Sequence, residues 1–324
     1  EIKEEGMRQN GFAPVVICQL THSGRYAKPE GVPAPLIAYN NPLFEKEQPI
    51  DKSRIVSDDK LKRLEEAFGA TALLAQEAGF DGADIKCCHR YLLSEMLSAF
   101  TRPGDYGGAF ENRTRLLRNA IFAAKGATSG EFLITSRVNL YDGFAYPYGF
   151  GVSPTGGLMP DLTEPKALVT LLHEELRLPM LDFTIGNPYV NPHVNRPYDG
   201  GPYVPDEHPL EGVARMLGCI GQLKKAFPSL CVIGSGFSYL RQFSPYLAAG
   251  AVEQSVCDLA GFGRMAFAYP DFPRDTLYGE GFNARKTCIA CGKCSALMRA
   301  GTVAGCVVRD GETYLPFYQA HCCV

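Results

Sequence analysis

The sequence predicts an α/β fold of the (β/α)8 barrel type. Six apolar, β-rich runs alternate with longer segments of helical periodicity, which is typical of a parallel sheet with helices outside it. The runs are continuously apolar, as strands that are buried on both faces should be. Three long loops each follow such a run, and the loops after the strands are where a barrel carries its functional site.

The expected elements follow from this alternation along the chain. The expected strands are residues 14–20, 82–88, 132–138, 181–186, 230–236 and 259–265. Helical patterns cover residues 59–78, 111–124, 165–176, 211–227 and 245–249, and residues 1–10 match the end of a helix. The loops over 21–57, 139–164 and 187–210 are rich in Pro, Gly, Tyr and Asn; disordered insertions are the alternative.

Six strands, where a barrel has eight, lead us to expect that the first two β/α units are missing from this sequence. The domain prediction is therefore an N-terminally incomplete barrel over residues 1–275. A Cys-rich extension over residues 276–324 is expected to follow it.

Composition excludes several classes of protein. A net charge of −3 and a pI near 6.1 give no basic surface for nucleic acid. No apolar run approaches the ~20 residues of a membrane span, and the polar first residues contain no signal peptide. Twelve cysteines in a chain without an export signal do not indicate a disulfide framework. We expect a cytoplasmic protein that neither enters a membrane nor binds nucleic acid.

Polar residues at the end of the strand 82–88 are the first candidates for chemistry. Lys86, His89 and Tyr91 provide an amine, an imidazole and a phenol within six residues. Such a group can hold an electronegative substrate atom and transfer a proton to it. The alternative is a buried strand followed by incidental loop residues.

Two strand residues suit the polar edge of a flavin ring. Gln19 ends a strand and offers both a donor and an acceptor, as a pyrimidine edge with alternating C=O and N–H requires. Arg137 lies in an apolar strand, where it could stabilise an anionic reduced ring. A polar strand terminus is the alternative for Gln19, and a structural ion pair is the alternative for Arg137.

Glycines at the last two strand ends suit a phosphate. The first group is Gly234, Ser235 and Gly236, and the second is Gly263 with Arg264. Small residues let backbone N–H groups approach a phosphate, and an Arg binds it as a fork. In many barrels the phosphate site is formed by the loops after strands seven and eight, which these would be.

Four cysteines near the carboxyl end have the spacing of a metal site. Three form a C-x2-C-x2-C run, and the fourth follows after eleven intervening residues; the four are Cys288, Cys291, Cys294 and Cys306. The tight run with a distant fourth thiol favours a [4Fe–4S] cluster. Zinc and unmetallated thiols are the alternatives.

Five segments together resemble the Old Yellow Enzyme superfamily of FMN-dependent NADH:flavin oxidoreductases. They are QLTHSGR at 19–25, GFDGADIKCCHRYLLSEMLS at 79–98, TRPGDYGGAFENRTR at 101–115, ITSRVN at 134–139 and AGFGRMAFAYPDFP at 260–273. With its cysteines the chain is most similar to the iron–sulfur branch that holds 2,4-dienoyl-CoA reductase and trimethylamine dehydrogenase. That branch carries a [4Fe–4S] cluster after the last barrel strand.

The resemblance assigns roles by position. It places Gln19 and Arg137 on the isoalloxazine ring and makes Tyr91 the proton donor. Lys86 and His89 take the positions where many members carry a His/His or His/Asn pair that grips the substrate carbonyl. Lys86 is therefore a departure from the family pattern. The flavin phosphate is assigned to Gly236, Gly263 and Arg264.

The function implied is reduction of the C=C bond of an α,β-unsaturated carbonyl or enoyl compound. Hydride would come from flavin N5 and the proton from Tyr91, with His193 as a further substrate contact. The implied cofactors are FMN, a [4Fe–4S] cluster and NAD(P)H, and an electron-donor domain or protein is the implied partner beside a small-molecule substrate. A homo-oligomer is left open. The alternatives are an amine dehydrogenase-like flavoenzyme that passes electrons to the cluster, and a non-catalytic metal-stabilised module.

Overall fold

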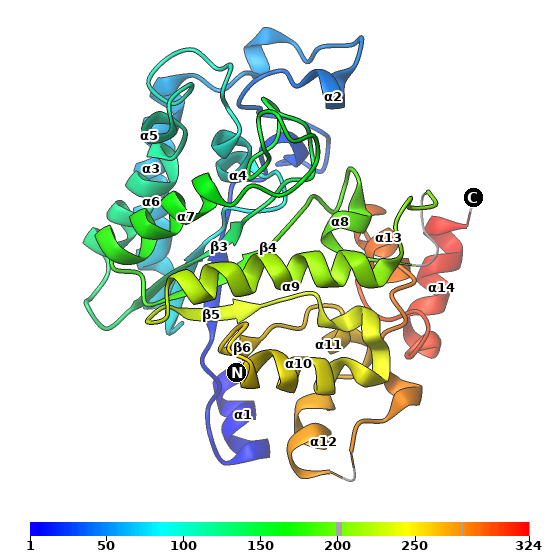
Figure 1. Cartoon of the computed structure of the whole chain (residues 1–324). Coiled ribbons are helices and arrows are strands. Elements are labelled where there is room, and N and C mark those ends of the chain that lie inside the picture. Colours follow the sequence, from blue (N-terminus) through cyan, green and yellow to red (C-terminus); the bar gives the residue numbers. More distant parts are fainter. Residues whose placement is uncertain (199–202, 280, 324) are drawn as a thin grey trace. The chain divides into compact units, whose positions relative to one another are not determined.

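The computed structural model describes residues 1–198, 203–279 and 281–323 (Figure 1). Its contacts divide the chain into two compact units. Unit 1 is Glu1–Asn187 with Ser229–Cys231, and unit 2 is Pro188–Pro228 with Val232–Val324. The predicted boundary at residue 275 falls inside unit 2 and stays a prediction. Residues 199–202, within the third predicted long loop, lie outside the described residues.

Unit 1 alternates strands and helices, as the sequence predicts. Its helices are α1 (Ile2–Asn10), α2 (Pro42–Glu45), α3 (Asp58–Glu77), α4 (Leu92–Leu97), α5 (Phe110–Arg113), α6 (Arg115–Ala127) and α7 (Thr163–Val169). Its strands are β1 (Ile17–Leu20), β2 (Gly82–Ile85), β3 (Leu133–Asn139) and β4 (Met180–Thr184). Short 3₁₀ turns cover Gly24–Tyr26 and Lys52–Arg54, and a π-helix covers Thr170–Glu175.

The four strands of unit 1 run parallel and lie side by side in chain order. Gln19 of β1 pairs with Asp84 of β2, and Arg137 of β3 pairs with Asp182 of β4. Every residue of β2 is buried, as a central parallel strand should be. The predicted α/β class with a parallel sheet is confirmed, and the carboxyl ends of these strands share one edge.

The long helix α3 begins and packs for reasons visible in the sequence. Ser57 caps it by accepting a hydrogen bond from the Lys60 N–H at 3.3 Å, and two aspartates follow in the first turn. Its buried face includes Leu61, Phe68 and Ala72. That face packs against α6 on the outside of the sheet (Figure 1). The prediction of a helix over 59–78 is therefore correct to within one residue at each end.

Unit 2 contains the last two strands and the Cys-rich segment. Its helices are α8 (Pro192–Asn195), α9 (Pro209–Ala226), α10 (Ser244–Glu253), α11 (Met265–Ala268), α12 (Phe272–Tyr278), α13 (Lys293–Arg299) and α14 (Gly311–Cys322). The strands β5 (Cys231–Gly234, whose first residue belongs to unit 1) and β6 (Leu259–Ala260) are parallel. 3₁₀ segments cover Phe237–Phe243 and Ala284–Lys286.

Several predicted elements have other bounds in the structure: the strand expected over 82–88 ends at Ile85, and the helix expected over 245–249 covers Ser244–Glu253. Three predicted elements differ more. The strand expected over 259–265 ends after Ala260, because the glycine-bearing turn that follows leads directly into α11. The helix expected over 111–124 is two helices that meet at Thr114. The helix expected over 165–176 changes to π geometry at Thr170. Local geometry of this kind depends on packing more than on periodicity.

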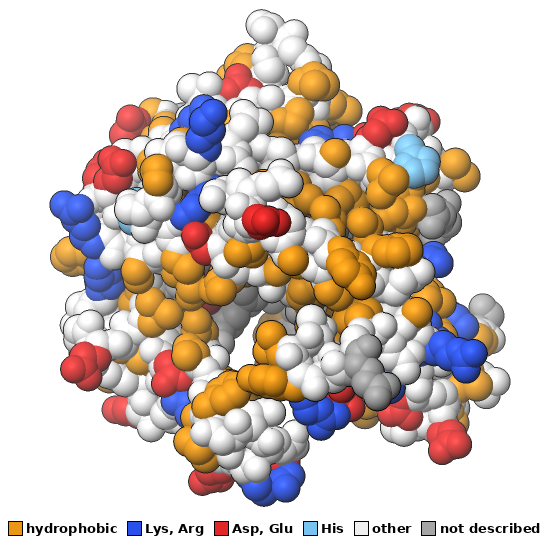
Figure 2. Space-filling view, turned by 60° about the horizontal axis from the view of Figure 1, so that its bottom comes forward, with side chains coloured by type: hydrophobic (Ala, Val, Ile, Leu, Met, Phe, Trp, Pro, Cys, Tyr) orange, Lys and Arg blue, Asp and Glu red, His pale blue; other side chains and the backbone are white. Residues whose placement is uncertain are grey.

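The surface has no single dominant character. Figure 2 shows charged side chains of both signs scattered over the visible face, with hydrophobic side chains gathered in patches between them. Within the described part of the chain, no helix combines the length and the apolar character that crossing a bilayer requires.

Gly82 tests the packing of β2 against β3. A Cβ at this position would overlap the Leu133 carbonyl oxygen and approach the Leu133 Cβ to 2.8 Å. Because the obstacle is backbone, the strands must separate to admit a methyl group. We expect Gly82→Ala to lower the free energy of unfolding by about 1–3 kcal/mol in chemical denaturation.

The matched control is Gly126→Ala in α6, where an added Cβ meets no atom within 4 Å. This change should be neutral or stabilising, because alanine favours a helix. Equal stability of the two variants would show that β2 and β3 are not closely packed at Gly82.

Candidate functional site

The structure brings two of the predicted site residues into contact at the end of β2. The Lys86 Nζ lies 3.8 Å from the centroid of the Tyr91 ring, and the lysine is only 9% exposed. A cation on the face of an aromatic ring is attracted by the ring's quadrupole. Lys86 and Tyr91 therefore form one unit, here called the Lys86–Tyr91 pair.

The backbone between them makes an unusual turn. His89 and Arg90 both have left-handed conformations, with φ of 64° and 57°. Each such residue costs about 1–3 kcal/mol unless the surroundings hold it in place. Tyr91 then occupies the N-cap position of α4. The turn lies in the six-residue connection between β2, which ends at Ile85, and α4, which begins at Leu92.

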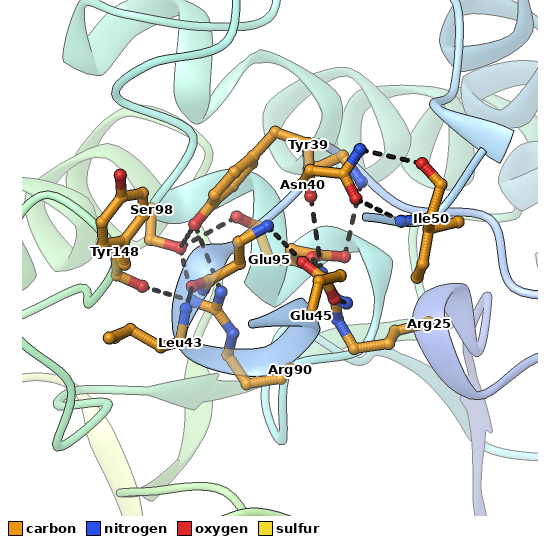
Figure 3. Close-up of polar contacts among 12 residues, drawn as sticks. Arg25, Tyr39, Asn40, Leu43, Glu45, Ile50, Arg90, Glu95, Ser98 and Tyr148 are labelled. Carbon is orange, nitrogen blue, oxygen red and sulfur yellow. Dashed lines mark hydrogen bonds and ion pairs between the residues drawn. The ribbon is translucent and has the colours of Figure 1, made fainter. Parts of the chain in front are cut away.

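Arg90 holds this turn through a buried network (Figure 3). Its guanidinium is fully buried and donates to the Asp142 carboxylate at 2.8 Å, the Tyr148 carbonyl at 3.2 Å and the Tyr39 hydroxyl at 3.2 Å. It also donates to the Ser98 hydroxyl. Asp142 is 1% exposed, so the two charges are buried together. Tyr39 lies in the loop over 21–57 and Asp142 in the loop over 139–164. The Arg90 side chain therefore connects both loops to the turn at His89 and Arg90.

A second buried cation lies beside this network. Arg25 forms ion pairs with Glu45 of α2 and Glu95 of α4, and the three side chains are at most 8% exposed (Figure 3). Its guanidinium carbon also lies 5.1 Å from the Phe44 ring centroid. Sequence analysis singled out neither Arg25 nor Arg90. Arg90 precedes apolar residues, which is the signal used for Arg137, whereas Arg25 lies in a polar segment and gives no such signal.

A row of polar side chains crosses the four strands of unit 1. The Gln19 amide donates to the Asp84 carboxylate at 3.1 Å, and the Arg137 Nε lies 3.1 Å from an Asp182 carboxylate oxygen. The structural ion pair considered for Arg137 is therefore present. It leaves open a flavin role for the same side chain, which is 28% exposed.

Burial and neighbouring charges shift the acid–base behaviour of this row. Burial, followed by the nearby Asp182 carboxylate, raises the pKa of Asp84 to about 6. Burial lowers the pKa of Lys86, and the Arg137 cation adds to that shift. The row thus contains an acid that titrates near neutrality beside a lysine that holds its proton less tightly than usual.

Tyr26 is a further aromatic neighbour that sequence analysis did not identify. Its ring centroid lies 5.9 Å from that of Tyr91, and its hydroxyl accepts a hydrogen bond from the Asn187 amide at 3.3 Å. Burial raises the pKa of Tyr26, so it stays protonated at neutral pH. It follows the QLTHSGR segment and packs beside the predicted proton donor.

The predicted phosphate residues lie together in unit 2. Gly234 ends β5 and its carbonyl accepts from the Gly261 N–H at 2.7 Å, so the two glycine-bearing turns leave adjacent parallel strands. Gly236 has φ of 103°, and a Cβ there would lie 2.5 Å from the Met216 sulfur. Ser235 lies between these two glycines, and Gly263 with Arg264 lies just before α11.

His193 lies in unit 2 and is bonded there. Its Nε2 is 3.1 Å from a Glu207 carboxylate oxygen, and its Nδ1 accepts from the Tyr198 N–H at 3.5 Å. The histidine is 3% exposed, and burial lowers its pKa. Both ring nitrogens thus have partners within unit 2, and the predicted substrate contact stays a prediction.

The four cysteines of the spaced run line one small cavity in unit 2. Apolar side chains form much of its wall, together with cations; the lining includes Cys288, Cys291, Cys294, Cys306, Ile289, Val307, Arg264 and Arg309. Burial raises the pKa of the Cys288 thiol, whose sulfur accepts from the Ala290 N–H at 3.4 Å. Across residues 1–198, 203–279 and 281–323, no three His, Cys, Asp or Glu side chains are placed to hold a metal ion. The metal site stays a prediction.

The predicted site residues therefore divide between the units. Unit 1 contains the ring and substrate candidates, and unit 2 contains the phosphate and cysteine candidates together with His193.

The buried Asp84 makes stability depend on pH. Its folded pKa of about 6 exceeds the ordinary value of 3.8, so the folded chain binds this proton more tightly than the unfolded chain. Stability should consequently fall as pH rises from about 4 to about 6. In Asp84→Asn this fall should be absent, which melting temperatures measured from pH 4 to pH 7 will show.

Asp161→Asn is the control. Asp161 is a half-buried acid whose pKa is lowered by its hydrogen bond to Thr163, so its replacement should leave the decline between pH 4 and pH 6 in place. A pH profile of Asp84→Asn that matches the unmodified chain would rule out the raised pKa.

Comparison with known proteins confirms the resemblance seen in the sequence. Residues 5–150 match the NADH:flavin oxidoreductase / NADH oxidase family. An NADPH dehydrogenase of Clostridium acetobutylicum is 33% identical over 156 residues, which are 48% of this chain and 42% of that protein. An NADPH dehydrogenase of Bacillus subtilis is 34% identical over 138 residues, 41% of this chain and 37% of that protein. The match thus spans less than half the length of these curated relatives.

Solved structures confirm the fold. A 2-naphthoyl-CoA reductase in complex with 2-naphthoyl-CoA gives a TM-score of 0.71 at 19% identity, covering 95% of this chain and 44% of that chain. Histamine dehydrogenase from Rhizobium sp. 4-9 gives a TM-score of 0.66 at 22% identity, covering 89% of this chain and 38% of that chain. An old yellow enzyme homologue from Zymomonas mobilis gives a TM-score of 0.59 at 20% identity, covering 86% of this chain and 70% of that chain. The strands and helices described above are thus arranged as in barrel enzymes of this kind.

Proposed function

We propose that this NADH:flavin oxidoreductase-like chain binds FMN and reduces the C=C bond of an α,β-unsaturated carbonyl compound with electrons from NAD(P)H. The observation that carries the proposal is the Lys86–Tyr91 pair. It places a buried cation and a phenol together at the carboxyl end of β2, within the segment that matches the family. Carboxyl ends of strands are where barrel enzymes hold their substrates.

The residues of unit 1 fit a flavin ring. Gln19 is exposed although it lies in a strand, so its amide is accessible to a ring edge with alternating donors and acceptors. Arg137 keeps a partly exposed cation two strands away on the same sheet. In unit 2, Gly236, Gly263 and Arg264 would hold the phosphate, assisted by Gly234 and Ser235. FMN, when bound, would supply hydride from N5 to the β-carbon of the substrate.

The chain's own part in the reaction is to bind the carbonyl and to deliver a proton. Lys86 and His89 would hold the carbonyl oxygen, where negative charge develops as hydride arrives. Tyr91 would then give its phenolic proton to the α-carbon. The Lys86 ammonium on the face of the Tyr91 ring would stabilise the negative charge that develops on the ring as the proton leaves.

The Cys-rich segment fits an iron–sulfur cluster in its donor set. Four thiols line one cavity with apolar walls and nearby cations, and soft thiolates in such surroundings suit iron–sulfur chemistry. Cys288, Cys291, Cys294 and Cys306 would hold it. When bound, the cluster would pass electrons singly between FMN and a donor or acceptor.

Tyr91→Phe tests the proton donor. The flavin-loaded variant should reduce 2-cyclohexenone about 10²–10⁴-fold more slowly, because the proton must come from elsewhere. Flavin reduction by NADPH, followed at the flavin absorbance band, should not change.

Tyr106→Phe is the matched control, since it removes a hydroxyl that is bonded to Glu65. It should leave enone reduction unchanged. A chain that binds no FMN on reconstitution would contradict the proposal, as would turnover of secondary or tertiary amines with no turnover of enones.

Metal analysis tests the cysteines. Anaerobic reconstitution with iron and sulfide should give about four iron atoms per chain and a broad absorbance that dithionite bleaches. Cys294→Ser should lose both signals, and Cys322→Ser should retain them. Stoichiometric zinc in place of iron, or no metal at all, would overturn the assignment.

A further inference from the structure

A second concave site lies in unit 2 next to the cysteine cavity, and Arg264, Cys291 and Lys293 line both. Its volume is about 450 Å³, which falls within the range of small-molecule sites. Residues from α8, α13 and α14 line it, with Arg264 (Figure 1). Of the five residues expected to bind the flavin phosphate, Arg264 alone reaches this cavity.

Cations dominate the lining of the cavity. They are Arg196, Arg264, Lys293 and Arg299, and the described residues place no aspartate or glutamate in the lining. Among the described residues, the Arg196 guanidinium donates to two uncharged groups, the Ser295 hydroxyl at 3.4 Å and the Pro188 carbonyl at 3.3 Å. Burial lowers the pKa of Arg196, and Arg264 and Arg299 lower it further. Clustered cations without a carboxylate are stabilised by a bound anion.

The number of cations exceeds what a single phosphate monoester needs. Such a group carries at most two negative charges, whereas three basic side chains border this cavity besides Arg264, which is already assigned to the flavin phosphate. A ligand with two or more phosphate groups matches that charge better. Arginine and lysine are the side chains that bind phosphate.

Aromatic rings complete the lining. Tyr189, Tyr198 and Tyr318 border the cavity, and the Lys293 Nζ lies 5.2 Å from the Tyr318 ring centroid. Aromatic side chains stack on nucleobases irrespective of base identity. Phosphate-binding cations next to aromatic rings are the combination that a nucleotide requires.

We propose that this cavity binds the phosphorylated adenosine end of a nucleotide, with the cations on its phosphates and a tyrosine ring on its adenine. Two ligands carry such an end: an acyl-CoA, which has a 3′-phosphate, and NADPH, which has a 2′-phosphate. Which of the two binds rests on the proposed function, in which an acyl-CoA would be the substrate and NADPH the electron donor. Binding itself does not require flavin chemistry, so the two proposals can fail separately.

Calorimetry with two short probes tests the site on the whole chain. We expect 3′,5′-ADP or 2′,5′-ADP to bind, with or without saturating FMN, and the preferred isomer identifies the source. Arg299→Gln and Lys293→Gln should each weaken binding about tenfold or more, because each loses a charge-assisted contact. Arg285→Gln is the control: it removes one positive charge from an exposed position of unit 2 outside the cavity, and should bind as the unmodified chain does.

Three results would overturn the proposal. The first is that neither probe binds to a chain that is folded by thermal melting. The second is that FMN displaces the probe, which would make this cavity part of the flavin site. The third is that Arg285→Gln weakens binding as much as Arg299→Gln does, which would indicate a general effect of net charge.

Discussion

The buried ion pair between Arg90 and Asp142 is the constraint on which the candidate site depends. Both side chains are at most 1% exposed and lie 2.8 Å apart. Removing either partner would leave an uncompensated charge in the interior, which typically costs about 3–5 kcal/mol. Because Arg90 has a left-handed backbone, the pair also fixes the turn that presents His89 and Tyr91. Two long loops meet on the same guanidinium, so the candidate site in unit 1 is organised around one side chain.

Long periodic elements were the part of the fold that the sequence predicted best. The helices over 59–78 and 211–227 are correct to within two residues, because each has an N-terminal cap and an apolar face that repeats over several turns. The strand over 259–265 was too long, since glycines and apolar residues fit a turn as readily as a strand. The π geometry at Thr170 has no periodic signal at all.

The candidate site was also predicted only in part from the sequence. Lys86 and Tyr91 were chosen because they are close in sequence and differ in chemistry, but their stacking depends on the turn between them. The partner of Arg90 is 52 residues away in the chain, and that of Arg137 is on the next strand. Pairings over such separations arise from the folded topology, which spacing along a chain does not encode. The cationic cavity is a similar case, because its four basic residues come from three separate segments.

The polar row across the sheet of unit 1 constrains how this chain can diverge. Gln19, Asp84, Arg137 and Asp182 occupy four successive strands, and the middle acid interacts with residues on both sides. Replacing Arg137 or Asp182 alone leaves the other charge of the ion pair without its partner. We therefore expect related sequences to change these positions together, so that a change of charge on one strand is accompanied by a compensating change on the next. Correlated substitutions at these positions among homologues would then indicate which strands are neighbours, even without a structure.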